Sequence, residues 1–163
     1  MRCSIPDPNS TETQMAVMLP DPDMLALAER IARFIQTLDT TEIAHVFADR
    51  AVSIIENFAP YRFDGHAAVA EWAAAMSAHR AATANLRHTF GPPQDYSRTE
   101  HHAFFSLPTS WTGTVRDRAF AETGGWAFVL VRQSAGWRVQ SYGWAVTSMR
   151  VEPLRETQEL PAG

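Results

Sequence analysis

The sequence has no lysine and only one cysteine among its 163 residues. All 14 positively charged side chains are arginines, so catalysis through a lysine Schiff base is excluded. The lone Cys3 cannot form an internal disulfide, and a single cysteine is too few for a cysteine-based metal centre. These absences favour a reducing compartment, and we expect a cytoplasmic protein.

Long apolar runs and ligand-binding loops are also lacking. No apolar stretch approaches the roughly 20 residues of a membrane-spanning helix, and residues 1–20 have no apolar core of signal-peptide length. The sequence has no glycine-rich phosphate loop, no G-x-S-x-G motif and no H-E-x-x-H motif. Its formal charge of −4 does not favour binding to the phosphate backbone of a nucleic acid. We expect no membrane, nucleic-acid, metal or cofactor partner.

The order of the expected elements predicts an α+β fold. Residues 1–20 and 151–163 have the composition of flexible tails, which leaves one domain over 21–150. Helices are expected over 21–38, 39–47 and 64–80, with a turn over 59–65. Strands are expected over 51–58, 83–90, 99–115, 119–133 and 136–148. Three early helices followed by a meander predict helices packed on one face of a curved, mostly antiparallel sheet.

Three segments resemble the NTF2-like superfamily, in its SnoaL-like and ketosteroid-isomerase-like branches. The segment "VFADRAVSIIENFAPYRFDGHAAVAEW" is similar to the family's first strand, turn and following helix, which carries an aromatic residue such as Trp72. The segment "HAFFSLPTSWTGTV" is similar to its long strand with a proline in the middle. The segment "GGWAFVLVRQSAGWRVQSYGWAVTS" is similar to its closing hairpin. The resemblance covers about 24–149.

This resemblance implies a cone-shaped α+β barrel whose sheet curls around the helices and leaves a cavity. It also implies frequent homodimers through the sheet face, and a superfamily divided between small-molecule enzymes and non-catalytic binding modules. Fold alone does not choose between these functions. The isomerase branch forms an oxyanion hole from a tyrosine on the first helix and a protonated aspartate on a later strand. The matching segments 21–38 and 124–133 lack both residues, so a steroid isomerase is not expected.

Glu56 is the first candidate for chemistry. Alternate residues of a strand over 51–58 point the same way, so Glu56 shares a face with Val52, Ile54 and Phe58. If this face lines the cavity, desolvation raises the pKa of the Glu56 carboxyl group. Such a group suits general acid–base catalysis near neutral pH.

The resemblance bears on Glu56 in two ways. Counting back from Gly65 matches Glu56 to the catalytic aspartate of the isomerase branch, whereas counting forward from "FAD" matches Ile55 to it. The alternative to catalysis is a carboxylate that is solvated at the mouth of the strand or paired with Arg62. A pocket position without catalysis lies between these interpretations.

His88 is the second candidate, because it shares a strand face with Leu86 and Phe90. Imidazole titrates near neutrality, so His88 and Glu56 could form an acid–base pair. The alternative is a core histidine bonded to the backbone or to a tyrosine. His79, at the end of a helix, is expected in solvent.

Aromatic side chains are expected to contact a ligand, although alternation alone does not say which strand face lines the cavity. Tyr142 and Trp144 share one face of the last strand, whereas Trp137 and Val139 share the other. The neighbouring His101 and His102 point to opposite faces, so one of them is expected on the cavity side. The candidate ligand contacts are Ile54, Phe58, Trp72, His102, Trp111, Tyr142 and Trp144.

Two functions follow from these patterns. The first is a cofactor-independent isomerase, cyclase, dehydratase or hydrolase that acts on a small apolar molecule, with Glu56 as acid or base and His88 or Tyr142 as its partner. The second is a non-catalytic module of the same fold that binds a small ligand or forms a homodimer through its sheet.

Overall fold

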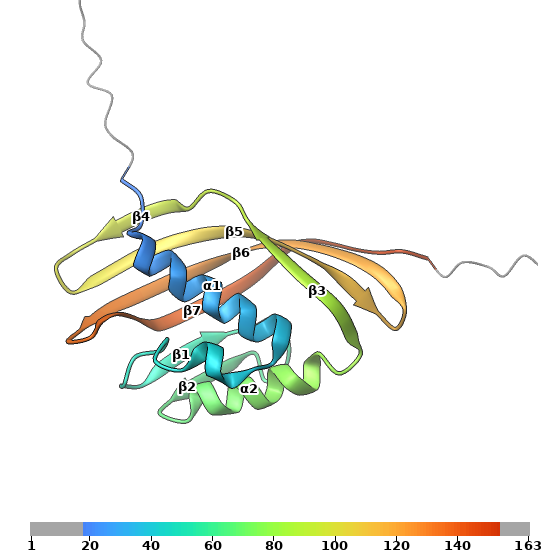
Figure 1. Ribbon diagram of the computed structural model, residues 1–163, viewed down its shortest axis with the longest axis horizontal. Helices are drawn as coiled ribbons and strands as arrows, with labels where there is room; N and C mark the ends of the chain where they lie inside the picture. The colour runs from blue at the N-terminus through green and yellow to red at the C-terminus, as the bar shows by residue number, and fades with distance from the viewer. Residues whose placement is uncertain (1–17, 154–163) are drawn as a thin grey trace, which may run out of the picture.

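A curled sheet forms the body of the computed structural model, which describes residues 18–153 (Figure 1). Its strands are β1 (Val52–Ile55), β2 (Arg62–Gly65), β3 (Thr83–Phe90), β4 (Gln94–Arg98), β5 (His102–Val115), β6 (Arg118–Gln133) and β7 (Gly136–Val151). The helices in this range are α1 (Pro22–Thr37), the short 3₁₀ helix η1 (Thr40–Ile43) and α2 (Ala68–His79). The predicted tails at 1–20 and 151–163 fall mostly outside the described residues.

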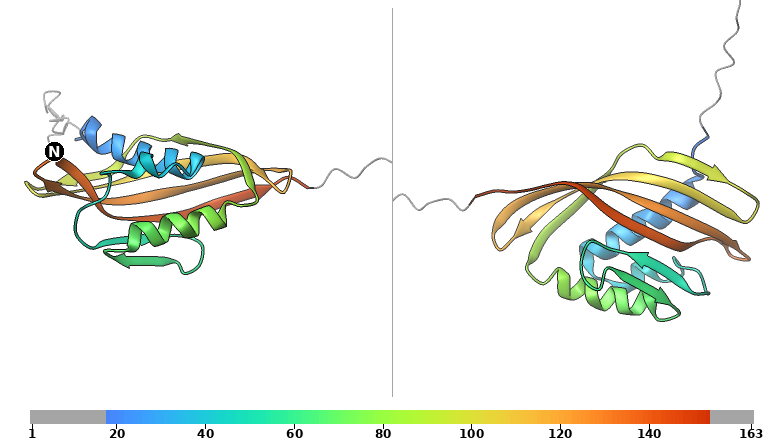
Figure 2. Two further views of the ribbon diagram at one scale, coloured as in Figure 1. Left: turned by 60° about the horizontal axis from the view of Figure 1, so that its bottom comes forward. Right: turned by 180° about the vertical axis from the view of Figure 1, so that it is seen from behind.

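The strands follow the order β2-β1-β7-β6-β5-β3, and β4 also pairs with β5. Neighbouring strands are antiparallel except β1 and β7, which run parallel with Ser53 opposite Ser141. The predicted mixture of helices with a mostly antiparallel sheet is confirmed. The predicted barrel is wrong, because β2 and β3 end the order and do not pair with each other, so the sheet stays open (Figure 2).

Helix α1 lies across one face of the sheet, here called the inner face (Figure 1). It begins at Pro22, whose fixed φ suits a first turn. Asp21 occupies the N-cap position but forms no capping hydrogen bond with its side chain, and its carboxylate binds Arg98 of β4 at 2.9 Å. No helix between residues 18 and 153 has both the length and the apolar character to cross a bilayer. The side chains that α1 buries recur at helical spacing: Met24, Leu27, Ala28, Ile31, Ala32, Phe34 and Ile35.

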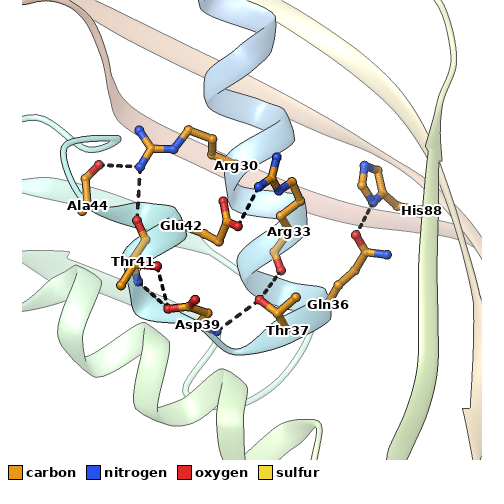
Figure 3. Close-up of polar contacts among 9 residues, drawn as sticks. All are labelled: Arg30, Arg33, Gln36, Thr37, Asp39, Thr41, Glu42, Ala44 and His88. Atoms are coloured by element: carbon orange, nitrogen blue, oxygen red, sulfur yellow. Dashed lines mark hydrogen bonds and ion pairs between the residues drawn. The ribbon is translucent and has the colours of Figure 1, made fainter.

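The predicted helix over 39–47 is wrong, because only the four-residue η1 forms there. Asp39 does cap this turn, since its side chain accepts a hydrogen bond from the Thr41 N–H at 2.9 Å (Figure 3). The chain then leaves helical geometry, because Val46 and Ala48 each form a backbone hydrogen bond of 2.9 Å with Val139 of β7. Residues 18–153 therefore hold two α-helices and not the three predicted.

Two short strands were missed by the sequence patterns. Strand β2 lies within the segment 59–65 that was interpreted as a turn, and it pairs with β1 so that Ile54 is opposite Phe63. Strand β4 pairs with the first half of β5, from Ser106 to Ala103. Both strands have mostly exposed, polar side chains, which hides the apolar alternation by which a strand is recognised.

A bulge in β7 determines which of its side chains face inward, which alternation alone left open. The register between β6 and β7 shifts at Gln140, which has no partner of its own in β6. Trp137 and Val139 before the bulge, and Tyr142 and Trp144 after it, are therefore all buried. Both rows face inward, and the aromatic residues of the last strand belong to one core.

Candidate functional site

An apolar pocket of about 460 Å³ opens between the C-terminal end of α2 and the end of the sheet where β5 turns into β6. Its apolar wall includes Phe58, Met76, Trp111, Phe120 and Trp126. The volume falls in the range of roughly 300–1,000 Å³ that is usual for small-molecule sites. The pocket also holds two carboxylates and several cationic side chains.

Glu56 lies directly after β1 at the pocket wall, with 5% of its surface exposed. Trp72 of α2 donates its indole N–H to Glu56 Oε1 at 2.9 Å, and Tyr142 of β7 donates its hydroxyl to the same oxygen at 2.6 Å. One carboxylate oxygen thus joins three elements that are distant in sequence.

The position of Glu56 matches the alternation of β1. Val52 is buried on the same side, whereas Ile55 is 51% exposed on the other. Arg62, the expected partner if Glu56 were a surface charge, instead pairs with Asp64 of its own strand. Glu56 is therefore a buried carboxyl group held by two neutral donors.

The second carboxylate oxygen of Glu56, Oε2, is available to a molecule bound in the pocket. Oε2 forms no hydrogen bond with any residue between 18 and 153. This oxygen is not fully enclosed by the protein either, so it retains accessible surface. Since Glu56 lines the pocket, Oε2 is the carboxylate atom that a bound molecule can reach.

Burial controls the protonation of Glu56. Desolvation raises the pKa of this carboxyl group from 4.5 to about 7, although the hydrogen bonds from Tyr142 and Trp72 act to lower it. The nearby charge of Glu122 raises the pKa further. Desolvation and the charge of Glu56 in turn raise the pKa of Tyr142, so its phenol stays protonated. Near neutral pH, Glu56 is therefore present in both its acid and its base form.

Glu122 of β6 is a second carboxylate in the pocket wall. Its Oε1 accepts a hydrogen bond from the indole N–H of Trp144 at 3.2 Å, and partial burial raises its pKa. Gly124 allows Trp144 to approach this closely. A Cβ at that position would lie 2.6 Å from the Trp144 ring and 2.2 Å from the carbonyl oxygen of Ala145.

Three arginines and one histidine line the pocket at the end of α2 and at the β5–β6 turn: His79, Arg80, Arg116 and Arg118. His79 stacks on Phe58, with ring centroids 4.2 Å apart and an angle of 12° between the planes. Desolvation and the charge of Arg80 lower the pKa of His79. His79 is exposed, as expected, and it also lines the pocket.

His88 does not pair with Glu56. Its ring lies against α1, where Nδ1 is 2.9 Å from Gln36 Oε1 and Nε2 is 3.0 Å from Glu29 Oε2 (Figure 3 shows the first contact). The ring also packs on Trp111, but it does not line the pocket. Both ring nitrogens are occupied by helix side chains, which is the arrangement of a core histidine.

The seven predicted ligand contacts fall into three groups. Phe58, Trp111 and Trp144 line the pocket. Ile54, Trp72 and Tyr142 are buried behind its wall, where Trp72 and Tyr142 hold Glu56. His102 is exposed at the start of β5, at the far end of that strand from the pocket residue Val115. Between residues 18 and 153, no three His, Cys, Asp or Glu side chains are grouped as a metal site.

No protein-family model matches the sequence, and no curated protein matches it. Solved structures do match. An NTF2-like superfamily protein from Salmonella enterica aligns with a TM-score of 0.64 and 17% identity, over 77% of this chain and 89% of that one. An NTF2-like protein of unknown function from Pseudomonas putida aligns with a TM-score of 0.59 and 17% identity, over 76% and 83% of the two chains. The chain has the NTF2-like fold.

An enzyme shares this NTF2-like fold. The hexachlorocyclohexane dehydrochlorinase LinA-type3 from Novosphingobium barchaimii aligns with a TM-score of 0.67 over 79% of this chain and 87% of that one. The two sequences are 7% identical, so the likeness concerns the fold and not the reaction.

The sequence patterns missed Glu122 and the three arginines at the pocket opening, here called the mouth: Arg80, Arg116 and Arg118. The alternation test that identified Glu56 would also have found Glu122, because in "FAETGGW" it shares a face with Phe120 and Trp126. The arginines gave no such signal, since Arg80 ends a helix and Arg116 lies in a turn. Only the contact between the β5–β6 turn and the end of α2 brings them together.

Proposed function

We propose that this protein binds a small, largely apolar molecule in the pocket and uses Glu56 as a general base in a cofactor-independent isomerisation or elimination. One observation carries the proposal. Glu56 has one oxygen fixed by two neutral donors and the other facing the pocket, with a pKa raised to about 7. A carboxylate in this state is a far stronger base than one in water and is still partly ionised at neutral pH.

The reaction needs only a positioned base and no further catalytic group from the protein. Oε2 of Glu56 takes a proton from an acidic carbon of the substrate, and the electron pair of the broken C–H bond moves into the substrate. In an isomerisation the proton returns at another atom, and in an elimination a leaving group departs with its own electron pair. Tyr142 and Trp72 keep Oε1 in place, so the base needs no reorientation.

The comparison with known structures supports elimination as one of the reaction classes. A dehydrochlorinase is built on the same fold at similar chain length, which shows that the fold can hold such chemistry. The apolar wall around Glu56 suits a substrate without strong hydrogen-bonding groups near its reacting carbon.

A second candidate function is a non-catalytic ligand-binding module. It is favoured by the two hydrogen bonds at Glu56 Oε1, which also join α2 to β7 and would serve a purely structural carboxyl group. A homodimer through the outer face of the sheet, where Ile55 is exposed, remains a prediction in either case.

The opening of 5-nitrobenzisoxazole tests the base directly, because this probe needs only the removal of one C–H proton as its N–O bond breaks. We expect turnover by the wild-type protein that rises with pH around a midpoint near 7. Glu56→Gln keeps an oxygen for Trp72 and Tyr142 but removes the base, and should lower the rate by about 100-fold or more. His88→Gln is the matched control and should leave the rate unchanged.

Two results would contradict the proposal. Turnover that survives Glu56→Gln would show that another group removes the proton. Absence of turnover in a folded wild-type protein would favour the non-catalytic module.

A further inference from the structure

The pocket has an unusual distribution of charge. Its two carboxyl groups, on Glu56 and Glu122, accept hydrogen bonds from neutral indole and phenol groups. Its three arginines, at positions 80, 116 and 118, form no ion pair with any residue between 18 and 153. The acidic and basic groups of the pocket therefore do not neutralise each other by contact.

Arg80 is fixed by the end of α1. Its Nη1 donates to the carbonyl oxygens of Ile35 and Gln36, the latter at 2.8 Å. Its Nε is enclosed and has no partner, and its Nη2 also forms no hydrogen bond within residues 18–153. Nη2 is not fully enclosed, so it retains accessible surface while Nη1 anchors the group.

Arg118, the first residue of β6, is anchored in a similar way. Its Nε donates to the carbonyl oxygen of Glu152 at 2.6 Å, and its two terminal nitrogens have no partner within the described range. Arg116 precedes it in the β5–β6 turn and is exposed. The N–H of Arg116 bonds the carbonyl oxygen of Ala82 at 3.1 Å, which ties this turn to the loop after α2.

These contacts hold unpaired guanidinium groups on two sides of one opening. The guanidinium groups of Arg80 and Arg118 are positioned by backbone carbonyls rather than by a carboxylate, so their positive charge is not neutralised and their orientation is already set. A guanidinium group in this state is a strong donor to an oxyanion, because the bonds are charge-assisted and little side-chain entropy is lost.

Building on the proposed function, we propose that the natural substrate is an apolar molecule with one anionic oxyacid group. The anionic group binds at the mouth between Arg80, Arg116 and Arg118, and the apolar body extends inward toward Glu56. The mouth then selects the substrate by charge, and the apolar wall places its carbon against Oε2. Such a substrate is a carboxylate or a phosphate ester, and the two share the same chemistry toward arginine.

Three probes with one aromatic body separate these contributions: 1-naphthylacetate, 1-naphthyl phosphate and the uncharged 1-naphthylacetamide. Their dissociation constants are measured by calorimetry at pH 7.5 and low salt. We expect at least one anion to bind about tenfold or more tightly than the amide. Added salt should reduce this preference, because the mouth is open to solvent. The anion that binds more tightly identifies the class of head group.

The double variant Arg116→Gln, Arg118→Gln should bring the anions and the amide to similar affinity. Arg80 is left unchanged, because its contacts with α1 also support the fold. The matched control is Arg150→Gln, which removes a charge from β7 opposite Ala121, on the outer face. This control should keep the preference for anions.

The inference is overturned if the amide binds as tightly as both anions, if none of the probes binds, or if Arg150→Gln lowers the preference as much as the double variant. None of these results depends on Glu56. Loss of benzisoxazole turnover in Glu56→Gln together with equal binding of amide and anions would leave the proposed function standing and refute only the anion site.

Discussion

The pH dependence of stability should change when Glu56 is replaced by glutamine. The folded state binds the Glu56 proton more tightly than the unfolded chain does, because burial raises the pKa from 4.5 to about 7. Between these two pH values the folded protein holds more protons than the unfolded one, so Glu56 makes the free energy of unfolding fall as pH rises. The total loss is about 3 kcal/mol, at 1.36 kcal/mol for each pKa unit.

Glutamine removes this loss but keeps an oxygen for Trp72 and Tyr142. The quantity to measure is the free energy of unfolding of Glu56→Gln minus that of the wild-type protein, from urea titrations at several pH values. We expect this difference to become more positive by about 3 kcal/mol between pH 4.5 and pH 8. Contributions from titrating groups that do not interact with Glu56 cancel in the difference. A difference that stays constant within about 1 kcal/mol would refute the reasoning, because Glu56 would then have an ordinary pKa.

The other predictions concern the neighbours of Glu56. Tyr142→Phe removes a hydrogen bond that lowers the pKa of Glu56, so the midpoint of the benzisoxazole pH–rate profile should move up. Glu122→Gln removes a like charge, so the same midpoint should move down, and shifts in one common direction would contradict the assigned causes. Gly124→Ala should lower the free energy of unfolding by about 1–3 kcal/mol through overpacking against Trp144. Gly125→Ala is its control, since a Cβ there meets nothing within 4 Å, and an equal loss in both would count against the packing argument.

The sequence predicted the pocket position of Glu56 because the signal for it is local. Alternation along β1 depends only on the pleat of one strand, and no bulge interrupts β1 before Glu56. In β7 the same argument assigned the faces wrongly, because the extra residue Gln140 changes which face the following side chains point to, among them Tyr142 and Trp144. A bulge arises from the match between two strands and leaves no clear trace in either one alone.

Long-range contacts explain the other differences. The helix expected over 39–47 is limited to η1 because Val46 and Ala48 bond to Val139, about ninety residues away in the sequence. His88 and Glu56 both carried the signal of a polar group on an apolar face. Only their partners distinguish them, because His88 meets two side chains of α1 while Glu56 keeps one oxygen free in the pocket.

The titration of the Glu56 carboxyl group decides whether the pocket holds a general base near neutral pH. Carbon-13 NMR of protein labelled at the glutamate side-chain carboxyl, compared with Glu56→Gln, assigns its resonance by absence. We expect one resonance with a midpoint near pH 7 that is missing from the variant. A wild-type spectrum in which the Glu56 resonance titrates near pH 4.5 would contradict the claim that the pocket holds a general base.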